Sequence, residues 1–227
     1  MAGLGPSGIL TAWETGQGRR PLDRALCILW AAGMTGPIAD WPLIVRDRAL
    51  LETRRQVLGD RLTLMTTCEE CAAELEIETS VAALVDALAD PSGTKIVVGG
   101  AEIVIRPLTS ADIAIFSDAS PEDLPDLTRA RLVGEVERSA SSAVDAEIER
   151  CLQDAELRFS LHCPDCGAGR SEPLDVADVV WREIEITARR LLNDVADLAS
   201  AFGWREPDVL ALSAARRGAY LSLARAK

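Results

Sequence analysis

Two Cys-x-x-Cys pairs constrain this chain more than any other feature of its sequence. The first pair is Cys68 with Cys71, and the second is Cys163 with Cys166, at an offset of 95 residues. Each pair follows a segment in which apolar and polar residues alternate, which is typical of a β-strand. Each is followed by an extended segment and a helix with a capping residue, Ser80 in the first copy and Asp175 in the second. The sequence therefore predicts two pseudo-repeated units of strand, cysteine turn, strand and helix.

The spacing of the cysteines predicts one metal site that both units share. A Cys-x-x-Cys turn can direct two sulfurs at one ion, and two such turns complete the four-ligand shell that zinc prefers. The 91 residues between the pairs exceed the gap of ordinary zinc ribbons, and an inserted subdomain accounts for them. We predict a structural Zn²⁺ held by all four ligands: Cys68, Cys71, Cys163 and Cys166.

Two alternatives to the shared zinc site remain at this point. The cysteine pairs could carry no metal, or they could act as a redox dithiol. A thioredoxin-type thiol opens a helix and has a lowered pKa. Here the acids Glu69 and Glu70 separate the first pair, and negative charge predicts a raised thiol pKa.

The remaining reactive residues do not form a catalytic set. Cys27 and Cys151 lie on predicted helices, where packing in the core is expected. His162 is the only histidine and directly precedes Cys163, which suggests a role at the surface or beside the metal ligands. The sequence has neither a Walker-type loop nor a dinucleotide fingerprint. We therefore expect no enzyme activity, no catalytic residues and no small-molecule substrate.

Composition and charge narrow the class of protein further. The chain has 227 residues, of which 48% are hydrophobic and only 4% aromatic, which favours closely packed helices. Its net charge of −12 argues against a nucleic-acid partner, since phosphate binding needs clustered Lys and Arg. No apolar run approaches the roughly 20 residues that span a bilayer, and the N-terminus lacks signal-peptide features. We expect a cytoplasmic location and no membrane contact.

The predicted fold class is helix-rich α+β with a zinc-ribbon-like core. Residues 1–20 are expected to be a flexible arm, and residues 21–90 to hold N-terminal helices and the first cysteine unit. A β-hairpin around Gly99–Gly100 and helices form an inserted subdomain over residues 91–155. The second cysteine unit and a C-terminal helical hairpin occupy residues 156–227.

The C-terminal segment carries a resemblance to a known family. Several short motifs follow one another there: a tryptophan, a Leu-Leu pair, a Gly-Trp turn, an Arg-Arg pair and a Tyr-Leu pair. An Arg-Asp pair lies upstream of them. These residues are Trp181, Leu191–Leu192, Gly203–Trp204, Leu210–Ser213, Arg216–Arg217, Tyr220–Leu221 and Arg46–Asp47. Together with the cysteine turns, they resemble phage baseplate proteins of the T4-like hub-assembly type, which extracellular contractile injection systems also encode.

The resemblance implies a structural component or assembly factor of a baseplate. Its partners would be hub or spike proteins of a contractile, phage tail-like particle, into which the protein could be incorporated. Two other functions stay open from the residues alone. One is a zinc-ribbon regulator that binds nucleic acid or protein, and the other is a dithiol redox protein.

Overall fold

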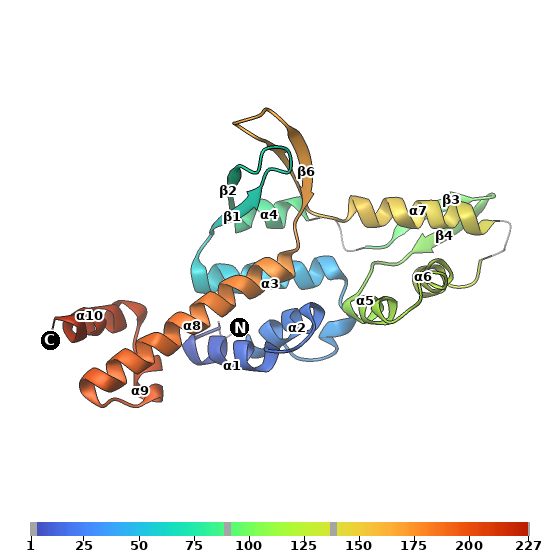
Figure 1. Cartoon of the computed structure of the whole chain (residues 1–227). Coiled ribbons are helices and arrows are strands. Elements are labelled where there is room, and N and C mark those ends of the chain that lie inside the picture. The colour runs from blue at the N-terminus through green and yellow to red at the C-terminus, as the bar shows by residue number, and fades with distance from the viewer. Residues whose placement is uncertain (1–3, 89–91, 137–139, 227) are drawn as a thin grey trace. The chain divides into compact units, whose positions relative to one another are not determined.

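The computed structural model describes residues 4–88, 92–136 and 140–226, and the chain divides into two compact units (Figure 1). The first unit joins Met1–Thr35 to Ala177–Lys227, and the second spans Gly36–Val176. Helices make up most of the described chain, and three separate two-stranded antiparallel hairpins supply its strands. The predicted helix-rich α+β class is confirmed at this level.

The first unit is built from helices alone. They are α1 (Pro6–Gly16), α2 (Pro21–Ala31), α8 (Val176–Phe202), α9 (Glu206–Leu210) and α10 (Ala214–Arg225). The structure corrects the predicted flexible arm, because α1 occupies it and buries Ile9, Leu10 and Ala12. Pro6 lies in the first turn of this helix, where proline is tolerated.

The approach of α1 to α8 depends on the absence of a side chain at Gly16. A Cβ atom built there would lie 2.4 Å from the ring of Trp181, which is itself buried. The guanidinium of Arg24 on α2 lies 5.0 Å from the centre of the same ring, a cation–π distance. Trp181 therefore packs against both N-terminal helices.

The C-terminal helical hairpin turns at Gly203 and closes over an aromatic cluster. The ring of Trp204 lies 5.2 Å from that of Phe202 and 4.7 Å from that of Tyr220. Beneath these rings Leu198, Val209 and Leu221 are buried. The Gly-Trp turn therefore serves packing between α8, α9 and α10.

The second unit contains the two cysteine hairpins. The 3₁₀ turn η1 (Ile38–Asp40) and the helix α3 (Leu43–Leu58) precede β1 (Arg61–Thr67), β2 (Glu74–Ser80) and α4 (Val81–Ala87). The second hairpin consists of β5 (Arg158–His162) and β6 (Gly169–Pro173). Ser80 caps α4 as predicted, because its hydroxyl accepts a hydrogen bond from the backbone N–H of Ala83 at 3.1 Å. On α3, Leu50 and Leu51 are buried, whereas Leu58 is exposed.

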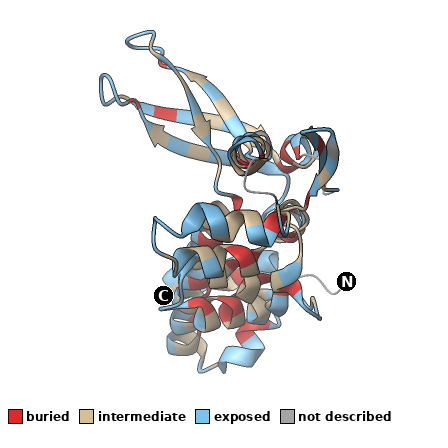
Figure 2. Ribbon diagram, turned by 90° about the vertical axis from the view of Figure 1, so that its right-hand side faces the viewer, coloured by how far each residue is buried: buried red, intermediate tan, exposed pale blue. Residues whose placement is uncertain are grey.

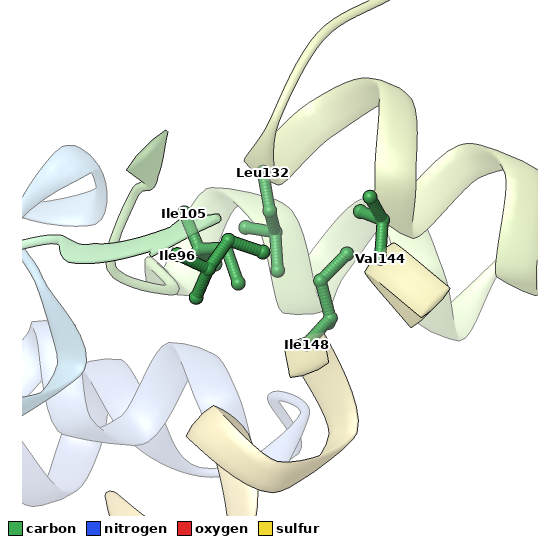
Figure 3. Close-up of a cluster of buried hydrophobic side chains, with 5 residues drawn as sticks. All are labelled: Ile96, Ile105, Leu132, Val144 and Ile148. Carbon is green, nitrogen blue, oxygen red and sulfur yellow. The ribbon is translucent and has the colours of Figure 1, made fainter. Parts of the chain in front are cut away.

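A third hairpin and three helices lie between the cysteine hairpins in sequence. They are β3 (Thr94–Val98), β4 (Ala101–Ile105), α5 (Ser110–Ser117), α6 (Leu124–Leu132) and α7 (Ser141–Asp154). Figure 3 shows the hydrophobic cluster that β3, β4, α6 and α7 share: Ile96, Ile105, Leu132, Val144 and Ile148. The tight turn at Gly99–Gly100 is confirmed, since both glycines have positive φ. Pro125 lies in the first turn of α6, where proline is tolerated.

One carboxylate joins α5 to the segments on either side of it. The fully buried side chain of Asp112 accepts paired hydrogen bonds from Arg106, both at 2.7 Å, and two more from Arg131 at 2.9 and 2.7 Å. Its hydrogen bonds with Thr109 complete a capping box at the start of α5. Burial alone would raise the pKa of Asp112, but these hydrogen bonds hold the pKa well below its usual range.

Burial differs sharply between the helices and the hairpins. Figure 2 shows buried residues mainly on helices, while the cysteine hairpins are largely exposed or intermediate along their strands. Among the described residues, no helix combines the length and apolarity needed to cross a bilayer.

Candidate metal centre

The four paired cysteines meet where the tips of the two cysteine hairpins lie side by side (Figures 1 and 2). Their sulfur atoms all lie within 4.8 Å of one another. Two close contacts cross between the hairpins: Cys68 Sγ lies 3.7 Å from Cys166 Sγ, and Cys71 Sγ lies 3.6 Å from Cys163 Sγ. The structure therefore brings together every residue predicted as a ligand, and the group could hold a metal ion.

The two turns that present the sulfurs have the same backbone hydrogen bonds. In the first turn, the N–H of Cys68 donates to Ala73 O and the N–H of Ala72 donates to Cys68 O, both at 2.8 Å. In the second, Cys163 donates to Ala168 O and Gly167 donates to Cys163 O, both at 2.9 Å. Each donor and acceptor of the first turn matches one 95 residues later.

Both turns also place one residue in the left-handed region of the backbone. Ala72 has φ of 59° and Gly167 has φ of 75°. Ala72 is the only residue other than glycine with positive φ among those the structure describes. Glycine adopts this conformation without the steric penalty that a Cβ atom brings, so the first turn stores strain that the second avoids.

The two cysteine hairpins also match each other in the pairing of their strands. The strand pairing closes on Thr67 opposite Glu74 in the first hairpin and on His162 opposite Gly169 in the second. Arg170 on β6 donates to the hydroxyl of Thr66 on β1 at 2.8 Å, and it pairs with Glu69 at 3.5 Å. This arginine therefore ties the second hairpin to the first beside the sulfurs.

The four cysteines differ in burial and in the pKa of their thiols. Cys68 and Cys163 are buried with Leu75, whereas Cys71 and Cys166 are exposed. Hydrogen bonds from the backbone of Cys71 and then of Glu70 lower the pKa of Cys68 to about 7. The backbone of Ala73 lowers the pKa of Cys71, but contact with the Cys163 thiol and burial together outweigh it and raise that pKa to about 12.

These values change one prediction made from the sequence. The acids between Cys68 and Cys71 predicted raised thiol pKa values, yet the pKa of Cys68 is lowered. The reason is local geometry: backbone N–H groups of the turn donate to the sulfur and stabilise its thiolate form. Sequence alone does not show where these N–H groups point.

The other cysteines and the histidine lie outside the cluster. Cys151 packs against the hydrophobic cluster of the third hairpin, in line with the core role predicted for it. Cys27 is half-buried on α2. His162 is exposed at the end of β5, and it is not one of the residues whose ligand atoms gather.

Sequence reasoning did not anticipate Arg170 or the backbone donors of the first turn. A charged residue on the inward face of a short strand is a weak signal in the sequence. The direction of backbone N–H groups leaves no signal there at all. Comparisons with protein-family models, with curated protein sequences and with solved structures find no match to this chain.

Proposed function

We propose that the four cysteines hold one structural zinc ion. A tetrahedral shell with Zn–S bonds of about 2.3 Å separates its sulfurs by about 3.8 Å. The two cross-hairpin contacts of 3.6 and 3.7 Å are close to this edge length. Soft thiolate ligands in a tetrahedral group favour zinc, and four protein ligands leave no open position for substrate. The convergence of the sulfurs is the observation that carries the proposal.

We further propose that the two cysteine hairpins are a pseudo-repeat that forms a zinc-ribbon-like core. Matching hydrogen bonds and left-handed residues at an offset of 95 support it. So does the position of the following helices, since α4 begins at Val81 and α8 at Val176, again 95 residues apart. The ion would then cross-link two halves of one chain, with residues 91–155 inserted between them.

At the level of function, we propose a structural component or assembly factor of the baseplate hub and spike in a contractile, phage tail-like particle. The support is the resemblance described above, together with the packing of several residues that carry it. Trp181 is buried against α1, and Trp204 and Tyr220 form the aromatic cluster. The partners proposed are hub or spike proteins, and the role proposed is not enzymatic.

The proposed zinc is tested by measuring metal content on the purified full chain. We expect about one zinc per chain by plasma mass spectrometry, lost in Cys163→Ser and in Cys166→Ser. The matched control is Cys151→Ser, which removes a thiol outside the cluster and should retain the metal. A folded wild-type chain without bound metal would overturn the proposed site.

The proposed assembly role is tested by affinity purification of the tagged chain from its native host. Hub or spike proteins recovered with wild type, but not with Cys163→Ser, would support it. Two assays address the alternatives. Salt-dependent DNA binding would favour a nucleic-acid regulator. Reduction of insulin disulfides would favour a dithiol redox protein, since a lowered thiol pKa like that of Cys68 is typical of reactive cysteines.

A further inference from the structure

Arg170 holds a position in the cysteine hairpins that no other basic residue of these hairpins shares. The two hairpins contain no lysine and three arginines: Arg61, Arg158 and Arg170. Arg61 is the first residue of β1 and Arg158 the first of β5, at the strand ends away from the cysteines. Arg170 is the second residue of β6, next to the turn with the second cysteine pair. Any positive side-chain charge that the hairpins place close to the sulfurs must therefore come from Arg170.

A small cavity joins Arg170 to the two buried cysteines. Cys68, Cys163 and Arg170 all line it. Its volume is about 70 Å³, which is enough for a water molecule. Leu75 and Leu161 also line it, and Leu161 lies opposite Arg170 in the second hairpin. Because both cysteines are buried, a nearby charge acts on their sulfurs with less screening than at the surface.

The contacts of Arg170 leave its Nε–H group unsatisfied. Nη2 donates to the Thr66 hydroxyl at 2.8 Å and pairs with Glu172 at 2.5 Å, and Nη1 lies 3.5 Å from Glu69. The Nε atom is buried, and among the residues that the structure describes it has no hydrogen-bond partner. A buried donor without a partner costs free energy unless an acceptor reaches it. In the cavity shared with the cysteines, a thiolate can supply that acceptor, directly or through a water.

The charges around the cysteine cluster call for a positive side chain. Zn²⁺ offsets only half of the negative charge of four thiolate ligands. The two turns add acids, since Glu69 and Glu70 lie within the first cysteine pair and Asp165 within the second, and all three are exposed. Crowded negative charges favour protonation of the thiolates, which competes with metal binding. A guanidinium in the wall of the cavity opposes this effect.

From this arrangement we propose that Arg170 is a positioning residue of the metal centre, and that its charge stabilises the metal-bound thiolates. The inference rests on the proposed zinc site and adds to it a residue that supplies no ligand atom. Residues that surround the ligands of a metal commonly change its affinity about 10- to 100-fold. Arg170 acts through Cys68 and Cys163, whose cavity it shares.

The test measures the zinc affinity of the full chain by competition with a chelator, at low and at high ionic strength. Arg170→Gln removes the charge but keeps a side chain that can form hydrogen bonds, and it should lower the affinity about tenfold at low salt. The loss should become smaller at about 1 M salt, because salt screens the charge that the variant removes. Arg170→Lys retains the charge and should restore most of the affinity.

A matched variant separates the charge beside the sulfurs from a general weakening of the hairpin. Arg158→Gln makes the same chemical change in the same hairpin. Arg158 pairs with Glu156 and donates to the hydroxyl and the carbonyl of Ser171, so its structural contacts are as extensive as those of Arg170. The variant should nevertheless leave the zinc affinity unchanged, because Arg158 lies at the far end of β5.

Two further variants separate the charge of Arg170 from its hydrogen bond to the first hairpin. Thr66→Val removes the hydroxyl that Arg170 binds and should lower the affinity less than Arg170→Gln does. Glu69→Gln removes a negative charge from the first turn and frees Arg170 from its pairing there. It should raise the affinity, so that the two charge changes have opposite signs.

The outcomes distinguish this inference from the zinc site on which it rests. A wild-type chain that binds no zinc would overturn both. If the wild type binds zinc, three results would overturn the role of Arg170 alone: unchanged affinity in Arg170→Gln, no restoration in Arg170→Lys, or an equal loss in Arg158→Gln. Circular dichroism verifies that each variant is folded. Glu69→Gln keeps the test decisive if Arg170→Gln does not fold, since an affinity that is not raised would contradict the charge argument.

Discussion

The two units of this protein differ in charge and in what holds them together. The unit formed by Met1–Thr35 and Ala177–Lys227 has 11 basic and 9 acidic residues, a net charge of +2. The unit Gly36–Val176 has 13 basic and 27 acidic residues, a net charge of −14. The acidity of the whole chain therefore comes from the unit that contains the cysteine cluster, and repulsion within that unit opposes its compact state.

The two units also differ in how their buried side chains pack. The helical unit buries large residues along α8, including Trp181, Ile184, Leu191 and Leu198. In the acidic unit, the cluster beneath the hairpin tips has only three buried residues: Cys68, Leu75 and Cys163. So small an apolar cluster supplies little folding energy, and small β-structures of this kind commonly depend on a metal or a disulfide. The comparison teaches that the cysteine hairpins of the acidic unit rely on specific polar cross-links, whereas the helical unit, like the cluster around the third hairpin, relies on apolar packing.

The largest expected effect comes from removing the metal, which should break one unit and spare the other. Treatment of the zinc-loaded chain with a chelator should expose the amides of residues 61–80 and 158–173 to hydrogen exchange. Structural zinc contributes on the order of 10 kcal/mol in the smallest zinc domains, and that figure is an upper bound for this larger chain.

The control lies within the same measurement. Amides in the second half of α8 and in α10 should keep their protection, because apolar packing holds these helices. Equal loss of protection in both units would contradict the contrast drawn between them. Mass spectrometry of the exchanged peptides reports both regions at once.

The next effect concerns the buried carboxylate of the acidic unit. Asp112→Asn should lower the free energy of unfolding by about 3 kcal/mol at neutral pH, because it leaves Arg106 and Arg131 without their common charge partner. Urea unfolding measures the change. A matched exposed variant, Asp86→Asn, should change stability by less than about 0.5 kcal/mol.

The pH dependence of the stability difference between wild type and Asp112→Asn follows from the lowered pKa of Asp112. The folded-state pKa lies below the unfolded value of about 3.9, so the stabilisation is complete above about pH 4 and is lost as pH falls further. The difference between wild type and Asp112→Asn should therefore narrow below pH 4. A difference that stays constant between pH 7 and pH 3 would mean that packing, not charge, accounts for the effect.

In the helical unit, packing should be the sensitive property. Gly16→Ala places a methyl group against the ring of the buried Trp181 and should destabilise the protein by about 2 kcal/mol. Gly218→Ala makes the same chemical change inside α10, where a Cβ atom meets nothing within 4 Å, and should stabilise by about 0.5 kcal/mol. Thermal unfolding of the two variants should shift in opposite directions, and shifts of the same sign would be evidence against the tight α1–α8 contact.

The smallest effect distinguishes the two cysteine turns. Gly167→Ala should destabilise by about 1 kcal/mol, since it introduces a Cβ atom at a left-handed residue. Ala72→Gly should stabilise by a few tenths of a kcal/mol, because relief of strain is partly offset by the greater freedom of glycine in the unfolded chain. The stability of both variants in the zinc-loaded chain, measured by chemical unfolding, tests whether the turns are equivalent.

Much of the local structure was predictable because it depends on neighbouring residues. Helix α4 begins directly after its predicted capping residue Ser80, and the turn at Gly99–Gly100 has the expected geometry. The arm at residues 1–20 was predicted wrongly, because Gly and Pro there suggested irregular structure. Its helix is stabilised by burial of Ile9 and Leu10, a contribution that local propensity does not contain.

The sequence by itself determined which residues can bind a metal, since two cysteine pairs between strand-like segments identify the ligands from their spacing alone. Only the tertiary structure decided that the sulfurs meet within 4.8 Å and that backbone N–H groups lower the pKa of Cys68. The physical reason is range. Alternation, capping and turn preferences act over a few residues, whereas these sites join segments up to about a hundred residues apart, whose meeting depends on the packing of the chain between them.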